Sequence, residues 1–217
     1  MLSRDALLVC LTACARAVAV GALSVFFGVY LQRRGLSQVQ IGYGIAAGLA
    51  GMAAGTLVVG LLADRLGRRR SLSAVALVMA LSAVALALLD AFEPILFATF
   101  VGMVNGMGRD RGAAQPIDQA VLAQCVAPAQ RTAVFARYTM VVDLGTAVGS
   151  LLVSVTLERE AFAASLLAYA ALVGATALVY PFMTAAAEPV ASAAPSLLSP
   201  ESRRRVSRFA ALSAVDS

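Results

Sequence analysis

The chain has 217 residues, of which 60% are hydrophobic and only 13% are charged, with a formal net charge of +5. A soluble domain normally carries about 25% charged residues, so the composition excludes an ordinary soluble protein and indicates a membrane protein. The positive charge does not indicate nucleic-acid binding, because most arginines lie in short loops between apolar blocks and form no basic stripe.

The residue types also limit the chemistry that the chain can perform. The sequence has 3 cysteines and no histidine. Without histidine or a Cys-x-x-Cys pair, it predicts no metal site and no cofactor. A membrane-embedded enzyme is one alternative class, but the common sets of nucleophile and base are missing, so we expect no enzymatic activity.

Apolar blocks along the chain predict an all-α bundle of about six transmembrane helices, because each spanning helix needs about 20 apolar residues. The first block is longer than the apolar part of a signal peptide and lacks an obvious cleavage site, so we expect a permanent span. The expected transmembrane domain covers residues 1–187, with helices at 6–31, 35–63, 71–89, 94–125, 132–157 and 161–187.

Two further segments follow this domain. Residues 188–202 are rich in Ala, Ser and Pro and have the composition of a linker, expected on the cytoplasmic side. Residues 203–217 begin with arginines and continue as an apolar stretch. We interpret this stretch as the start of a seventh helix that is cut off early, which favours a fragment of a longer protein.

The fourth apolar block contains the charged run Arg109-Asp110-Arg111. Dividing the block there leaves a first piece, residues 94–108, that reaches only about 22 Å, short of the roughly 30 Å hydrocarbon core. The division would also place the later arginines outside the cell, against the positive-inside tendency. We therefore predict one long helix over residues 94–125, with the charged run inside it.

With this number of spans, most arginines fall on one side of the membrane. The positive-inside tendency assigns that side to the cytoplasm, so we expect both termini to be cytoplasmic in a multi-pass protein of the cell membrane. The pair Arg33-Arg34 is a local exception, because it falls in an outer loop.

The loop after the second span, residues 60–70, reads GLLADRLGRRR. Gly60 can let a neighbouring helix come close, and Asp64 ends the apolar run at the membrane surface. Gly67 permits a tight reversal of the chain. The arginines anchor the loop at the cytoplasmic face, where they can pair with Asp64 or with anionic lipid.

This loop resembles the signature of the major facilitator superfamily, a Gly-x-Leu-Ala-Asp-Arg-x-Gly-Arg-Arg pattern between the second and third helices. The segments 33–37 and 127–131 resemble other parts of the family's first half. The resemblance implies a fold of two six-helix halves with the substrate site between them. It also implies that Asp64, Arg65 and Arg68 help to hold the cytoplasmic side shut in one state; the alternative is that the loop is only an anchor.

A second group of candidate residues is polar or charged and falls inside the predicted spans. Charged groups at the bilayer centre cost about 2.5–3.5 kcal/mol on insertion scales, so they usually face a cavity or a partner. On a continuous helix, Arg111, Gln115 and Asp118 would share one face. The candidates for a substrate or proton cavity are Arg16, Arg109, Asp110, Arg111, Gln115, Asp118 and Asp143.

Two interpretations of these charges remain open. In the functional one, Arg16 and Arg111 attract an anionic or zwitterionic solute, and Asp110, Asp118 or Asp143 exchanges a proton. In the structural one, arginine and aspartate neutralise each other between helices. Glycines that recur four residues apart predict close helix packing, at Gly44/Gly48, Gly51/Gly55, Gly102/Gly106, Gly108/Gly112 and Gly145/Gly149.

The leading functional hypothesis is a proton-coupled or facilitative carrier for a small solute, embedded in the lipid bilayer. The alternative is a half-length membrane scaffold without transport activity of its own. The other wall of the cavity would come from a missing C-terminal half or from a second copy of the chain. We expect the chain alone to insert into membranes without transporting.

Overall fold

The computed structural model describes residues 3–104, 106, 108, 112–156 and 162–189. All secondary structure in this described part is helical, which confirms the predicted all-α class. The elements are α1 (Arg4–Arg33), α2 (Gln38–Leu66), α3 (Arg68–Leu88), α4 (Phe92–Val101), α5 (Ala114–Cys125), η1 (Pro128–Gln130), α6 (Arg131–Thr156), α7 (Phe162–Val179), η3 (Tyr180–Phe182) and η4 (Ala185–Ala187).

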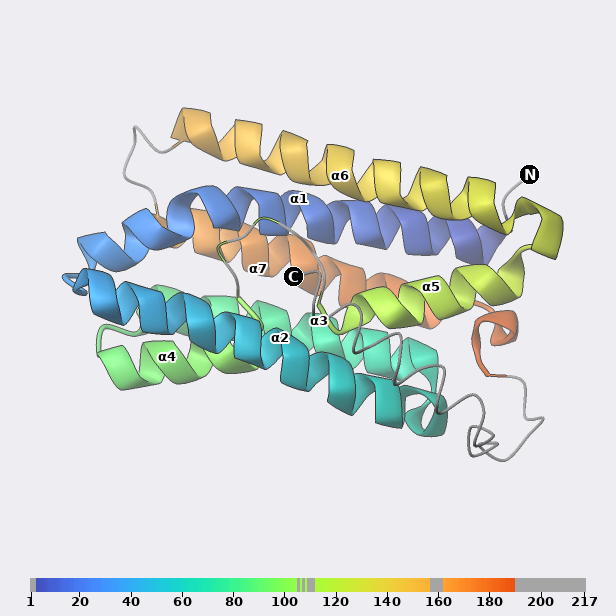
Figure 1. The fold of residues 1–217 in the computed structure, drawn as a ribbon, viewed down its shortest axis with the longest axis horizontal. Coiled ribbons are helices and arrows are strands. Elements are labelled where there is room, and N and C mark those ends of the chain that lie inside the picture. The colour runs from blue at the N-terminus through green and yellow to red at the C-terminus, as the bar shows by residue number, and fades with distance from the viewer. Residues whose placement is uncertain (1–2, 105, 107, 109–111, 157–161, 190–217) are drawn as a thin grey trace, which may run out of the picture.

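The helices run up and down along one long bundle (Figure 1). α1, α2, α3, α6 and α7 each cross its length, while α4 and α5 follow one another in the same direction and together make one crossing. Within the described residues, 4 helical segments are long and apolar enough to span a membrane, namely Arg4–Arg33, Gln38–Leu66, Arg68–Leu88 and Phe162–Phe182. The chain is therefore a multi-pass membrane protein.

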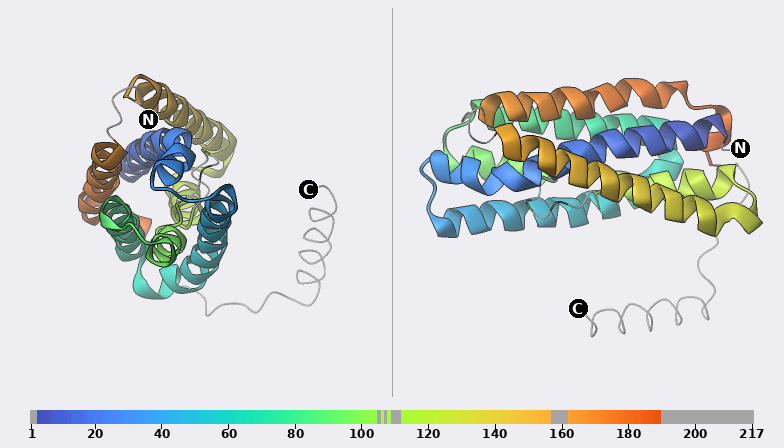
Figure 2. Two further views of the ribbon diagram at one scale, coloured as in Figure 1. Left: turned by 90° about the vertical axis from the view of Figure 1, so that its left-hand side faces the viewer. Right: turned by 90° about the horizontal axis from the view of Figure 1, so that it is seen from above.

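α1 lies at the centre of the packing, with α6, α7 and α5 against it (Figure 2). Its buried side includes Ala6, Ala13 and Ala17, each 0% exposed, so neighbouring backbones can come close. α3 packs on α7 and α2 packs on α4. α2 and α6 carry many exposed leucines, valines and methionines on their outer faces, as lipid-facing helices do.

The seam between α1 and α6 depends on glycine. A Cβ atom added to Gly149 would lie 2.0 Å from the carbonyl oxygen of Val18, and one added to Gly21 would lie 2.2 Å from that of Thr146. Gly48 and Gly51 make the same kind of contact between α2 and the α4 segment, where added Cβ atoms would lie 1.6 and 1.9 Å from carbonyl oxygens. The predicted packing role of the glycines is confirmed at these seams.

The prediction of one continuous helix over residues 94–125 is wrong. α4 ends at Val101, and α5 begins only at Ala114. The N–H of Val104 bonds to the carbonyl of Thr99, and that of Met103 to the carbonyl of Phe100, which is the Schellman pattern of a helix end. Met103 takes the left-handed conformation there, with φ of 54°.

The glycine-rich segment that follows α4 explains why the helix does not resume at once. Glycine weakens a helix interior by about 1 kcal/mol relative to alanine, and this segment contains Gly102, Gly106, Gly108 and Gly112. Gly108 has a positive φ of 69°. α4 and α5 still make a single crossing of the bundle, because the two short helices run in the same direction (Figure 1).

At the end of the bundle opposite the α2–α3 turn, Arg34 accounts for the exception to the positive-inside pattern. Its guanidinium pairs with the carboxylate of Asp90 and donates to the carbonyl of Ala87 at 3.0 Å. It also lies over the ring of Tyr30, 5.2 Å from the centroid. This arginine is therefore neutralised within the protein and ties the α1–α2 loop to the end of α3.

Candidate functional site

A buried cluster of charged and hydroxyl groups lies inside the bundle, between α1, α5, α6 and η3. Arg16 Nη2 donates to Asp118 Oδ2 at 2.6 Å, and Arg16 Nη1 donates to Tyr180 Oη at 2.9 Å. Tyr138 Oη donates to the same oxygen of Asp118 at 3.0 Å. The side chains of Arg16 and Asp118 are 1% and 0% exposed.

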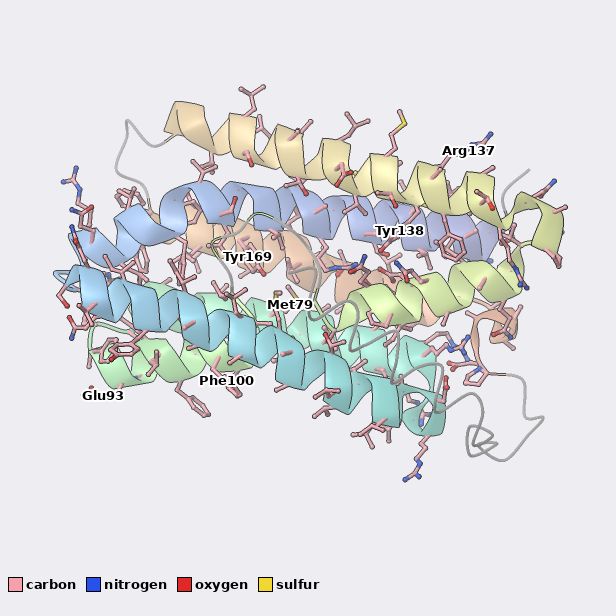
Figure 3. All side chains as sticks on the ribbon, viewed as in Figure 1. Met79, Glu93, Phe100, Arg137, Tyr138 and Tyr169 are labelled. Atoms are coloured by element: carbon pink, nitrogen blue, oxygen red, sulfur yellow. The ribbon has the colours of Figure 1, made fainter. Side chains whose placement is uncertain are left out.

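The helices themselves position this cluster. Arg16 lies mid-way along α1, Asp118 one turn into α5, and Tyr180 at the end of the last crossing. Figure 3 shows Tyr138 on α6, on the side that faces the rest of the bundle. Residues of this chain alone enclose the Arg16–Asp118 pair, so a second half of a transporter is not required to shield it from water. The pair has the geometry of mutual neutralisation between helices.

Of the other predicted cavity residues, the two that the structure describes, Gln115 and Asp143, form no hydrogen bond to this cluster. Gln115 is partly buried, one turn before Asp118 on α5. Asp143 is exposed on the outer face of α6, among apolar side chains. Arg109, Asp110 and Arg111 lie outside the described residues. Since α5 begins at Ala114, the helical spacing used to align Arg111 with Gln115 does not apply before that residue.

The motif loop forms the tight turn between α2 and α3. Gly67 has φ of 93°, a conformation that side chains rarely adopt, so the predicted reversal at this glycine is confirmed. Arg68 Nε pairs with Asp64 Oδ1 at 3.2 Å across one helical turn, and its Nη1 donates to Gln124 Oε1 at 2.7 Å. Asp64 remains 66% exposed, and Arg65 is exposed as well.

The expectation for Gly60 is wrong in this structure. A Cβ atom added there would meet nothing within 4 Å, so no neighbouring helix approaches this glycine closely. Gly60 instead lines a small pocket of about 130 Å³ together with Asp64, Arg68 and Pro116. The close approaches on α2 occur earlier in the helix, at Gly48 and Gly51.

Glu188 lies at the same end of the bundle and contacts the start of α3, although no sequence pattern pointed to it. Its carboxylate accepts from the backbone N–H of Arg68 at 2.7 Å and from Arg69 Nε at 2.8 Å. Its own carbonyl accepts from Gln124 at 2.9 Å. Partial burial raises the pKa of Glu188, but the hydrogen bonds from Arg69 and from the backbone outweigh burial and lower the pKa below its ordinary value.

Asp5 connects the start of α1 to the segment after α7, as Glu188 connects that segment to the start of α3. Its buried carboxylate accepts from the backbone N–H of Thr184 at 2.8 Å and from the hydroxyl of the same residue. The segment after α7 therefore fastens the beginnings of both α1 and α3. Tyr138, Tyr180, Glu188 and Asp5 were not predicted, because each pairs with a residue far away along the chain, as Arg16 does with Tyr180 at a separation of 164 positions.

The fold and these two charge clusters define a multi-pass helical membrane protein with ionisable groups enclosed in its bundle. The chain matches the family model of the Major Facilitator Superfamily over residues 7–215, and it belongs to that family. Membership implies membrane transport of small solutes; the family consists of transporters rather than enzymes. A search of curated proteins finds no relative that matches the chain.

Proposed function

We propose that the chain forms one half of a secondary carrier that moves a small solute across the cell membrane by alternating access. Both termini would lie in the cytoplasm, since the arginines of the α2–α3 turn and of the start of α6 gather at one end of the bundle. The second half of the cavity would come from a longer reading frame or from a second copy of the chain.

The observation that carries the proposal is the buried ion pair between Arg16 and Asp118. An ion pair that bridges two helices inside a low-dielectric bundle is strong only while both groups are charged. A proton delivered to Asp118 would cancel the carboxylate charge at that contact and weaken its hold on the Arg16 cation. That cation would then favour an anionic or zwitterionic solute, which couples proton binding to solute binding.

In this proposal, the α2–α3 turn that carries the family motif forms the gate. Asp64, Arg65 and Arg68 lie at the α2–α3 turn, where Asp64 and Arg65 are exposed and able to meet another part of the transporter. By resemblance to the family signature, these residues would hold the cytoplasmic side shut in one state. Asp143, exposed on α6, is a second candidate for proton exchange.

The test starts from the gene, read beyond codon 217, and uses the protein that its complete frame encodes. That protein is reconstituted into liposomes containing the pH dye pyranine, and organic anions and zwitterions are added outside one at a time. A carrier predicts solute uptake together with a change in internal pH. Asp118→Asn should abolish the pH change, while Asp118→Glu should retain part of it.

Two results would count against this function. If no solute in a broad panel enters, the half-length scaffold without transport becomes the better account. If uptake and its pH signal are unchanged in Asp118→Asn, Asp118 is structural, and the coupling mechanism proposed here is wrong even if the protein is a carrier.

A further inference from the structure

The four arginines of the motif loop divide into two kinds. Arg68 and Arg69 are held by Asp64 and Glu188, so their charges are satisfied inside the protein. Arg65 on α2 and Arg70 on α3 are exposed, and neither joins an ion pair within the part of the chain that the structure describes. Two cations therefore remain available at the surface of the α2–α3 turn.

An apolar groove begins beside these two arginines. It has a volume of about 370 Å³ and lies between α2, α3 and α4, with almost entirely apolar walls. Its lining includes Val58, Leu62 and Leu66 of α2, together with Val75 and Val78 of α3. Phe100, which projects from the outer side of α4 in Figure 3, also lines it, so the groove lies at the outer surface of the bundle.

The sequence positions link the arginines to the groove. Arg65 follows Leu62 by three residues, so both lie on the same side of α2. Arg70 precedes Ala74 by four residues on α3, and Ala74 lines the groove. Ala74 also lines a neighbouring pocket that contains Arg69 and Arg70. Of the helices that border the groove, α2 and α3 thus each carry an available arginine near the α2–α3 turn.

We propose that this groove is a binding site for one anionic phospholipid of the cytoplasmic leaflet. One acyl chain would lie along Leu62 and Val75, and the phosphate would lie between Arg65 and Arg70. Guanidinium groups bind phosphate oxygens through paired N–H donors, which suits two arginines at the headgroup depth. The choice of leaflet rests on the proposed topology, which places the α2–α3 turn at the cytoplasmic face.

The charge pattern favours this occupant over an apolar helix. A helix without acidic groups would cover the valines and leucines but leave both arginines unsatisfied at its edge. A zwitterionic lipid would fill the groove without supplying net negative charge. An anionic phospholipid satisfies both parts of the site at once, because its chain is apolar and its phosphate is negative.

Native mass spectrometry of the purified, delipidated chain in nonionic detergent tests the proposal. The probes are phosphatidylglycerol and phosphatidylcholine with identical acyl chains. The contribution of two arginines predicts roughly 30-fold tighter binding of phosphatidylglycerol. The double substitution Arg65→Gln with Arg70→Gln should remove that preference. The matched control is Arg131→Gln with Arg137→Gln, which makes the same change in net charge at exposed residues of α6.

A second pair of variants tests the groove. Ala74→Leu would fill it from α3 and should weaken the binding of both lipids, whereas Ala136→Leu, at an exposed position of α6, should not. Equal losses in the two double-arginine variants would overturn the proposal, because surface charge alone would then explain binding. Unchanged binding in Ala74→Leu would overturn the assignment of the acyl chain to the groove.

This outcome is independent of the proposed function. If transport is measured and the lipid preference is absent, only the lipid site is wrong. If the preference is present and no solute is carried, the site stands and the carrier proposal fails.

Discussion

The molecule contains two arginine–aspartate pairs of the same chemistry in opposite surroundings. Arg16 and Asp118 meet at 2.6 Å with side chains 1% and 0% exposed. Arg68 and Asp64 meet at 3.2 Å, and Asp64 is 66% exposed. The exposed pair lies in the recognisable motif, and the buried pair lies in no motif at all. The pair that is easiest to recognise in the sequence is therefore not the pair whose loss should cost the most stability.

The physical reason is the dielectric environment. Two unit charges at 4 Å interact by about 1 kcal/mol in water and several times more in a protein interior. Removing charges from water carries its own large penalty, so a buried pair is costly to break rather than strongly stabilising. An exposed pair one helical turn apart contributes only about 0.3–0.5 kcal/mol.

The largest effect should follow from breaking the buried pair. Asp118→Asn removes the carboxylate that pairs with the enclosed Arg16 cation. Removing one partner of a buried pair costs about 3–5 kcal/mol. Thermal or denaturant unfolding in detergent micelles would measure the loss.

The double substitution Arg16→Met with Asp118→Leu provides the control, since replacing both charges by apolar groups is often nearly neutral. The double variant should be markedly more stable than Asp118→Asn. A loss below about 1 kcal/mol in Asp118→Asn would mean that the cluster is wet and that the contrast between the two pairs is mistaken.

The next effect concerns the close contact between α1 and α6 near the buried cluster. Gly149→Ala places a Cβ atom 2.0 Å from the carbonyl oxygen of Val18, two residues beyond Arg16 on α1. Backbone must shift to accommodate it, and overpacking of this kind costs about 1–3 kcal/mol. Gly28→Ala on α1, the other helix of this seam, is the control, because its Cβ would meet nothing within 4 Å.

Gly28→Ala should leave stability unchanged or raise it by up to about 1 kcal/mol through helix propensity. Equal stability of Gly149→Ala and Gly28→Ala in the same unfolding assay would show that α1 and α6 are not in close contact.

The fold was predictable where the signal is local. Long apolar blocks predicted the helices, and glycines four residues apart predicted close seams such as the one at Gly149. The break between α4 and α5 could not be predicted from the length of the apolar block, because two short helices that share one crossing leave the number of crossings unchanged. The glycines from 102 to 112, read as packing residues, were the available signal.

A smaller effect, with a pH signature, belongs to Glu188. Glu188→Gln removes the charge that Arg69 and the start of α3 engage, and it should cost about 1 kcal/mol at neutral pH. The folded-state pKa of Glu188 lies below its ordinary value of 4.5. Its contribution is therefore fully present above about pH 4.5 and is lost as the pH falls through the lower folded-state pKa.

The stability difference between the wild-type chain and Glu188→Gln should thus stay constant from pH 7 to about pH 5 and shrink below that range. Unfolding curves across this pH range would measure it. A difference that grows on acidification would contradict the assigned contacts.

Of the candidate site, the sequence could supply the motif residues and the charges inside the spans, because both stand out against an apolar background. The sequence could not show which of these residues contact one another. Arg16 and Asp118 were both selected, but their pairing across 102 positions follows from the packing of α1 on α5. Tyr138 and Tyr180 look like ordinary span residues, and Glu188 falls in a segment with linker composition.

The smallest stability effect is expected at the exposed pair, and its small size makes it informative. Asp64→Asn should change the free energy of unfolding by no more than about 0.5 kcal/mol, because the carboxylate is largely in water and its partner Arg68 keeps the bond to Gln124. A carrier assay on the complete gene product should nevertheless lose rate if Asp64 belongs to a gate. Loss of rate without loss of stability would assign the motif to the transport cycle. Unchanged rate would leave the loop as a cytoplasmic anchor, and a large loss of stability would show that Asp64 makes contacts beyond the pair with Arg68.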